Sequence, residues 1–238
     1  MDLQVDLRGK VAVVTGGAGV LCSCLAKALA AQGAEVAVLD LRKEEAEKVA
    51  EEINRAGGRA AGLGADVLSR KSLEEAKEAV LKEFGTVDIL INGAGGNSPV
   101  ATTGPGQSFF DLAPEGIQKV FGLNFLGSVL PAQVFGRVMA EKKKGVIINI
   151  SSMAAYVPLT RTIAYSAAKA AVTNFTQWLA VHFNREYSPE IRVNAIAPGF
   201  LLTRQNEYLL IDEKTGGPTE RGRSILGRTP MWRYGVPE

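Results

Sequence analysis

Short apolar runs alternate with longer amphipathic runs along most of this chain. The apolar runs are rich in valine and isoleucine, and they predict strands buried on both faces of a sheet. The predicted strands span residues 10–15, 35–39, 60–65, 87–92, 145–150 and 191–197. Stretches with helical spacing cover residues 21–32, 43–55, 69–84, 114–139 and 164–183. This alternation predicts right-handed crossovers and an α/β fold with a doubly wound parallel sheet.

Two stretches interrupt the alternation. Residues 97–113 contain two prolines and two glycines, and they predict a long loop with little helix. Residues 201–235 are polar and rich in arginine, and they predict a loop or lid over a site, at about residues 201–230, rather than core. No linker-like stretch separates two apolar halves, so we expect a single domain over residues 1–238.

Composition and charge narrow the class of protein. Apolar types make up 46% of the 238 residues and charged types 22%, which predicts a folded domain and excludes disorder. The net charge of +2 is too small to indicate a nucleic-acid partner. Two cysteines and one histidine argue against a disulfide framework and a metal site. Without a long apolar run or a signal-peptide pattern, we expect a cytoplasmic protein with no membrane partner.

The first predicted strand leads into a glycine-rich turn. Gly17 and Gly19 fit the first two glycines of G-x-G-x-x-G, with Cys22 in the third position. Such a turn brings a pyrophosphate close to the backbone and to the N-terminus of the next helix. Asp40 ends the second strand, where a carboxylate accepts both ribose hydroxyls and repels a 2′-phosphate. The pattern predicts NAD rather than NADP, and a tight turn with a capping aspartate is the alternative.

A second constellation lies on the last long helix. Tyr165 and Lys169 are one helical turn apart, so their side chains share a face. A nearby ammonium group favours the phenolate and lowers the pKa of a tyrosine toward the range useful for proton transfer. Ser152 follows the strand at 145–150, so it lies at the carboxyl end of a strand, where ligands bind in open α/β sheets. These residues predict an acid–base site, and a solvated helix face is the alternative.

Five segments carry a resemblance to a known family. They are Thr-Gly-Gly-Ala-Gly at 15–19, Asn-Gly-Ala-Gly at 92–95, Asn-Ile-Ser-Ser at 149–152, Tyr-Ser-Ala-Ala-Lys at 165–169 and Asn-Ala-Ile-Ala-Pro-Gly at 194–199. In this order they resemble the short-chain dehydrogenase/reductase family, over nearly the whole chain. The resemblance implies a Rossmann-type fold and an oxidoreductase.

The resemblance also implies roles for individual residues. Tyr165 would be the general acid and base, and Lys169 would lower its pKa and hold the nicotinamide ribose. Ser152 would orient the substrate carbonyl, and Asn124 would support a water-linked proton path to the lysine. The residues that it implies for cofactor binding are Gly16, Gly17, Gly19, Val20, Leu21, Asp40, Asp66, Val67, Asn92, Ala94, Gly95, Tyr165, Lys169, Ile196, Pro198, Gly199 and Thr203. Among these, Asp66 and Val67 would flank the adenine.

The chain departs from the family pattern at three places. Val20 and Cys22 stand where the family usually has glycine, so the Val20 side chain must point away from the pyrophosphate or weaken binding. Gly93 stands where a second asparagine is usual. The family's final helix and closing strand do not follow residues 233–238, so either the sequence stops short or the sheet lacks that edge strand.

The segment Asn92–Thr103 is similar to the branch of the family that interconverts fructuronate and mannonate. The resemblance suggests a sugar-acid substrate, whose carboxylate would suit a bidentate arginine. The candidate substrate residues are Asn97, Ser152, Arg204 and Asn206, with Arg221 and Arg223 as further lid arginines. The bland alternative is that these residues are ordinary solvent-exposed loop positions.

Other functions stay open at this stage. The chain could reduce another carbonyl compound, such as a polyol-derived ketone, a ketoacyl thioester or a steroid. It could also be a dinucleotide-binding regulator without catalysis, although the Ser152, Tyr165 and Lys169 set argues against that. The resemblance further implies a homotetramer or homodimer.

Overall fold

The computed structural model describes residues 5–157, 159–203 and 207–237. The chain divides into two compact units, a first unit over Met1–Ala197 and a second unit over Pro198–Glu238. The sheet and the long helices belong to the first unit, and two short helices belong to the second. That both units act as one domain stays a prediction.

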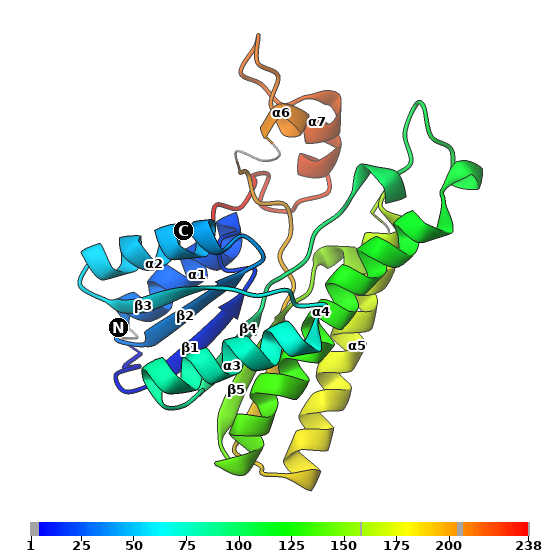
Figure 1. Cartoon of the computed structure of the whole chain (residues 1–238). Coiled ribbons are helices and arrows are strands. Elements are labelled where there is room, and N and C mark those ends of the chain that lie inside the picture. Colours follow the sequence, from blue (N-terminus) through cyan, green and yellow to red (C-terminus); the bar gives the residue numbers. More distant parts are fainter. Residues whose placement is uncertain (1–4, 158, 204–206, 238) are drawn as a thin grey trace. The chain divides into compact units, whose positions relative to one another are not determined.

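One parallel six-stranded sheet forms the centre of the first unit (Figure 1). Its strands are β1 (Val11–Thr15), β2 (Glu35–Asp40), β3 (Arg59–Gly64), β4 (Ile89–Asn92), β5 (Gly145–Ile150) and β6 (Ile191–Ile196). The order β3-β2-β1-β4-β5-β6 reverses direction between β1 and β4. Such a reversal is the switch point where open α/β sheets bind ligands. The predicted doubly wound parallel sheet is confirmed.

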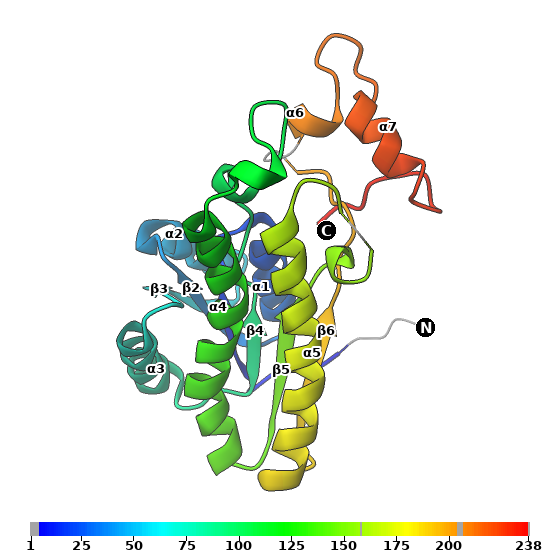
Figure 2. The same ribbon diagram turned by 90° about the vertical axis from the view of Figure 1, so that its right-hand side faces the viewer.

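Long helices cover both faces of this sheet. They are α1 (Val20–Ala31), α2 (Lys43–Arg55), α3 (Arg70–Phe84), α4 (Pro114–Glu141) and α5 (Ile163–Glu186). In Figure 1, α1 and α2 lie on one face, and α3, α4 and α5 lie on the other; Figure 2 shows α4 and α5 side by side. The N-terminus of α3 is capped as its sequence suggests, since the Ser69 hydroxyl accepts a hydrogen bond from the Ser72 N–H.

The strands read as continuous apolar runs because each alternates its side chains between two cores. Val13 and Leu90 belong to the core under α3, α4 and α5. Their chain neighbours Val14 and Ile91 belong to the core under α1 and α2. Each fully buried side chain of this size contributes roughly 1.5–3 kcal/mol to folding. Burial on both faces therefore explains why β1 and β4 carry no polar alternation.

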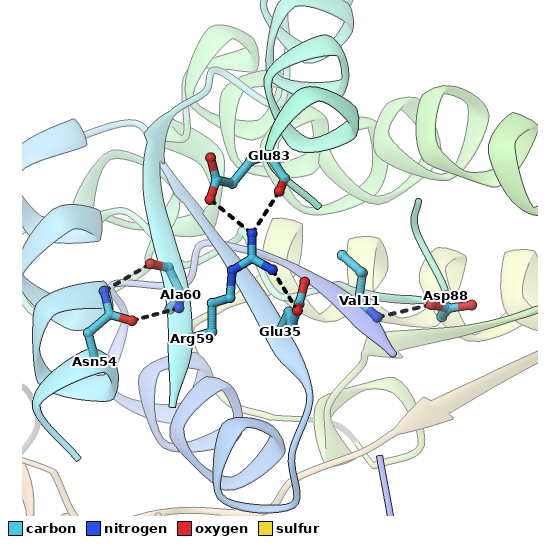
Figure 3. A network of polar contacts seen from close by, with 7 residues as sticks. All are labelled: Val11, Glu35, Asn54, Arg59, Ala60, Glu83 and Asp88. Atoms are coloured by element: carbon cyan, nitrogen blue, oxygen red, sulfur yellow. Dashed lines mark hydrogen bonds and ion pairs between the residues drawn. The ribbon is translucent and has the colours of Figure 1, made fainter. Parts of the chain in front are cut away.

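Polar contacts tie the sheet together at the amino ends of its strands (Figure 3). Arg59 at the start of β3 forms ion pairs with Glu35 at 2.7 Å and with Glu83 at 3.2 Å. The Asp88 carboxylate accepts a hydrogen bond from the Val11 N–H at 2.9 Å. The charged network thus lies at the amino ends of the strands, whereas ligands bind at the carboxyl ends of the strands in such folds.

The structure differs from the predicted elements at several of their ends and in one loop. Strand β4 begins two residues later than predicted, at Ile89. Strand β3 begins and ends one residue earlier than predicted. The loop at 97–113 contains two short 3₁₀ turns, Pro99–Ala101 and Phe109–Asp111. Among the described residues, no strand pairs with the outer side of β6, which is one of the two alternatives that the sequence leaves open.

The second unit is more ordered than the predicted loop. It contains α6 (Glu207–Leu210) and α7 (Glu220–Leu226), and Leu210 is only 1% exposed. The prediction of a loop over residues 201–235 is therefore wrong where α6 and α7 form. A covering role for this unit stays a prediction. None of the helices in the described part of the chain has the length and hydropathy to span a membrane.

Candidate active site

The glycine turn after β1 places the start of α1 beside the sheet. Gly16 has a φ of +61°, and a Cβ on it would lie 2.7 Å from the Cα of Ala94. A Cβ on Gly17 would lie 2.7 Å from the Val38 side chain. Gly19 closes the turn by donating its N–H to the Gly16 carbonyl at 3.0 Å. Since α1 begins at the next residue, its unpaired N–H groups and positive dipole end emerge from this turn.

Asp40 lies against the same turn. Its Oδ2 accepts a hydrogen bond from the Ala18 N–H at 3.2 Å, and its Oδ1 accepts one from the Arg42 N–H at 3.1 Å. The Arg42 guanidinium is 3.9 Å from Oδ1 and is mostly exposed. A carboxylate fixed beside a glycine turn and a helix N-terminus fits the adenosine ribose and pyrophosphate of NAD.

Ser152, Tyr165 and Lys169 converge at the carboxyl end of β5. The Ser152 Oγ accepts a hydrogen bond from the Ala154 N–H at 3.1 Å, and the Ser152 side chain is near enough to the Tyr165 hydroxyl to act on its pKa. The Lys169 Nζ lies 5.6 Å from the centroid of the Tyr165 ring. It also donates to the Ile150 carbonyl at 2.7 Å. The predicted convergence of phenol, hydroxyl and ammonium is therefore present in the first unit.

The electrostatics of this triad differ from the expectation. Burial raises the pKa of Tyr165 above its ordinary value, and the Ser152 side chain only opposes that rise. Burial also lowers the pKa of Lys169 to about 8. The expected lowering of the Tyr165 pKa by Lys169 is not found here. The reason is geometric, because the ammonium group is bonded to the Ile150 carbonyl rather than to the phenol.

Asn124 on α4 holds the backbone that follows β4. Its Nδ2 donates to the Gly96 carbonyl at 2.7 Å, and its Oδ1 accepts from the Gly96 N–H at 3.1 Å. A Cβ on Gly95 would lie 2.6 Å from the Asn124 Oδ1 and 3.4 Å from the Lys169 Nζ. Asn124, Gly95 and Lys169 are therefore neighbours, as the resemblance implies.

Several candidate residues use their side chains internally. Asn92 is 1% exposed and donates to the Asn149 Oδ1 at 2.8 Å and to the Ser128 carbonyl at 3.2 Å, so its amide joins strands and α4. Asp66 accepts from the Leu68 N–H at 2.9 Å. Val67 is buried and packs over Gly127. The Asn92 amide and the Val67 side chain are thus used inside the protein. These residues could contact a cofactor only through their remaining atoms.

The remaining candidates are dispersed. Val20 is the first residue of α1 and is half-buried, and Leu21 packs against the core under α1 and α2. Ile196 ends β6 and is 44% exposed. Asn97 donates to the Thr102 Oγ1 at 2.8 Å. Pro198, Gly199, Thr203, Arg221 and Arg223 belong to the second unit, whereas Arg204 and Asn206 lie outside the described residues.

Two residues hold loop backbone in the first unit, although no sequence pattern gave either of them a role. The Thr15 Oγ accepts from the Gly93 N–H at 3.2 Å and so ties β1 to the backbone after β4. Arg161 has a left-handed φ of +73°, and its carbonyl accepts from the Thr103 N–H at 3.0 Å. Its side chain is exposed and forms no ion pair within the described part of the chain. The sequence shows a cluster of arginines in the second unit, but Arg161 belongs to no motif or cluster that the sequence shows.

Comparisons with known proteins agree with this geometry. A family model for short chain dehydrogenases matches residues 10–214. An uncharacterized oxidoreductase of Bacillus subtilis, UxuB, is 52% identical over all of this chain and 87% of its own length. A D-threitol dehydrogenase of Mycolicibacterium smegmatis is 34% identical over all of this chain and 85% of its length.

A solved structure gives the same picture at the level of the fold. It is a crystal structure of a candidate D-mannonate oxidoreductase from Haemophilus influenzae with bound NAD. It superposes with a TM-score of 0.91 at 50% identity, covering 98% of this chain and 85% of that one.

Proposed function

Because this chain belongs to the short-chain dehydrogenase family, we propose that it is an NAD(H)-dependent oxidoreductase that interconverts a keto sugar acid and the corresponding hydroxy sugar acid. The observation that carries the proposal is the convergence of Ser152, Tyr165 and Lys169 beside a glycine turn. A regulator that only binds a dinucleotide would have no use for a buried ammonium next to a phenol.

The cofactor assignment is supported by the residues around the turn. Asp40 is held by two backbone N–H groups at the end of β2, where it would accept the ribose hydroxyls. A 2′-phosphate would meet this carboxylate, and Arg42 is already drawn toward the same Oδ1. When bound, NAD(H) supplies or accepts the hydride.

The protein's own residues handle the proton. In the direction of reduction, Tyr165 donates its phenolic proton to the substrate carbonyl oxygen as that oxygen gains negative charge. The Ser152 Oγ accepts from the Ala154 N–H, so its own proton can be donated to the same substrate oxygen. Lys169, protonated below about pH 8, would stabilise the remaining phenolate once its ammonium group turns from the Ile150 carbonyl toward the phenol.

The choice of a sugar acid rests on two supports. One is the similarity to the candidate D-mannonate oxidoreductase. The other is Arg161, an arginine without an acidic partner in the described chain, four residues before Tyr165. We place the contact with the substrate carboxylate on Arg161, since a guanidinium binds a carboxylate through two hydrogen bonds.

A polyol is the second candidate substrate. It is favoured by the D-threitol dehydrogenase and by an NAD-dependent glycerol dehydrogenase of Listeria innocua, each 34% identical over all of this chain. Polyols carry no charge, so Arg161 would then have no role in binding.

A substrate panel separates these proposals. NADH absorbance would be followed with keto-uronates, neutral ketoses, a ketoacyl thioester and a ketosteroid, and the reverse reaction would use NAD or NADP with hydroxy acids and polyols. We expect the highest kcat/KM with a keto-uronate and NADH. A higher value with a neutral ketose would replace the sugar acid, and a preference for NADPH would refute the role of Asp40.

The Tyr165→Phe variant tests the acid–base assignment. We expect kcat to fall about 10²–10⁴-fold, because the phenolic proton is lost. The Kd for NADH, measured by fluorescence, should change little. Turnover close to that of the parent would contradict the assigned role.

Assembly and location are part of the same proposal. We propose a homotetramer or homodimer that works in the cytoplasm. Support for self-association comes from α5, where Trp178 is 57% exposed and Val181 is 55% exposed. Trp178 stacks on His182 with ring centroids 4.7 Å apart, so the exposed face is an ordered apolar surface.

A further inference from the structure

Two departures from the family pattern lie in contact with each other. Cys22 stands in the first turn of α1 in place of a glycine, and Gly93 follows β4 in place of an asparagine. Cys22 is 4% exposed. A Cβ on Gly93 would overlap the Cys22 Sγ, far inside the van der Waals distance. The sulfur thus fills the space that a side chain at position 93 would need.

The contact joins the two backbone segments that flank the glycine turn. On one side, α1 begins just after Gly19. On the other side, Gly93 donates its N–H to the Thr15 Oγ, and the chain continues to Gly95 beside Asn124 and Lys169. A change in volume at Cys22 or Gly93 would therefore shift the helix N-terminus relative to the backbone beside the catalytic lysine.

The Cys22 thiol fills space in the packing here and does not act as a nucleophile. Burial raises the pKa of Cys22 to about 12, while Lys169 opposes the rise and Asp40 adds to it. The group is therefore neutral near pH 7.

We propose that Cys22 is a positioning residue of the cofactor site, which holds the Gly93–Gly95 backbone at its correct distance from the start of α1. The side chains at positions 22 and 93 are complementary in size. Either can be changed together with the other, but neither can be changed alone without weakening the binding of the dinucleotide.

This complementarity is tested by a double variant that removes one heavy atom from position 22 and adds one at position 93. The Cys22 Cβ lies 3.5 Å from the Cβ position of Gly93, an ordinary contact, so a Cys22→Ala/Gly93→Ala variant replaces the sulfur with a methyl group on the opposite side. The Thr15 carbonyl oxygen at 3.0 Å leaves this methyl group a tight fit. NADH binding would be measured by fluorescence, together with Tm and kcat at saturating NADH.

We expect Gly93→Ala to raise the Kd for NADH at least tenfold and Cys22→Ala to raise it about threefold. The double variant should bind NADH within about threefold of the parent. Cys24 offers a matched control, since it is a half-buried cysteine on the same helix. Cys24→Ala combined with Gly93→Ala should bind as weakly as Gly93→Ala does.

The outcomes distinguish positioning from general packing. A Kd for NADH that rises while kcat at saturating NADH stays near that of the parent supports the proposal. If Gly93→Ala does not fold and the double variant does, the rescue supports it as well. Parent-like binding by Cys22→Ala overturns the proposal, as does a double variant that binds no better than Gly93→Ala or that also fails to fold.

Discussion

At the scale of single residues, burial governs Lys169. Its pKa of about 8 lies below the ordinary value of 10.5, so between these two pH values the unfolded chain binds a proton that the folded chain has released. Stability must therefore rise with pH across this window, by up to about 1.4 kcal/mol per pH unit. Below about pH 8 both states are protonated, and the full cost of burying the charge remains.

A Lys169→Met variant makes this rise measurable. The free energy of unfolding would be obtained from urea titrations at pH 7.5, 8.5 and 9.5 for the parent and the variant. We expect the parent to gain stability relative to Lys169→Met by roughly 1 kcal/mol per pH unit above pH 8. Parallel pH profiles for the two proteins would show that Lys169 keeps its ordinary pKa.

Arg161 gives a second prediction at this scale. Replacing it by glutamine should raise KM for a keto-uronate roughly 10–100-fold, because a charge-assisted hydrogen bond contributes about 1.5–3 kcal/mol. KM for a neutral ketose and the Kd for NADH should stay constant. Arg185→Gln, at the far end of α5, is the control. An equal effect on charged and neutral substrates would remove Arg161 from carboxylate recognition.

At the scale of elements, the turn after β4 must fit between α4 and α5. Gly95 has no room for a side chain, since a Cβ there would lie 2.6 Å from the Asn124 Oδ1 and close to the Lys169 Nζ. Gly95→Ala should therefore separate these groups and lower kcat at least tenfold, measured at saturating NADH with the best substrate of the panel. Gly106→Ala, where a Cβ meets nothing within 4 Å, should retain parent activity. Full activity of Gly95→Ala would mean that the turn adapts freely.

The elements also show which parts of the fold local sequence can predict. The Ser69 hydroxyl caps α3, a role typical of serine at this position, and strands such as β1 and β5 coincide with short apolar runs rich in valine and isoleucine. Residues 201–235 show no helical periodicity because α6 and α7 span only four and seven residues. Leu210 is buried to 1% exposure, and a single buried residue in so short a helix leaves no periodic signal.

At the scale of the whole molecule, the exposed face of α5 predicts self-association. A Trp178→Glu/Val181→Glu variant should sediment as a smaller species than the parent in analytical ultracentrifugation, because two charges would enter the apolar contact. Leu41→Glu, at an apolar residue that is 74% exposed on the first unit, should leave the sedimentation unchanged. A parent that is monomeric at all concentrations would refute the assembly.

Sequence alone pointed to the doubly wound sheet, the glycine turn with Asp40, and the set of Ser152, Tyr165 and Lys169, because each shows as a recognisable pattern: apolar runs that alternate with helical spacing, glycines after a strand, and a tyrosine and a lysine one helical turn apart. Only the tertiary structure decided that the Lys169 ammonium bonds the Ile150 carbonyl, that burial raises the pKa of Tyr165, and that Cys22 fills the space over Gly93. These features depend on desolvation and on contacts between distant segments, and neither quantity is written in the local order of residues.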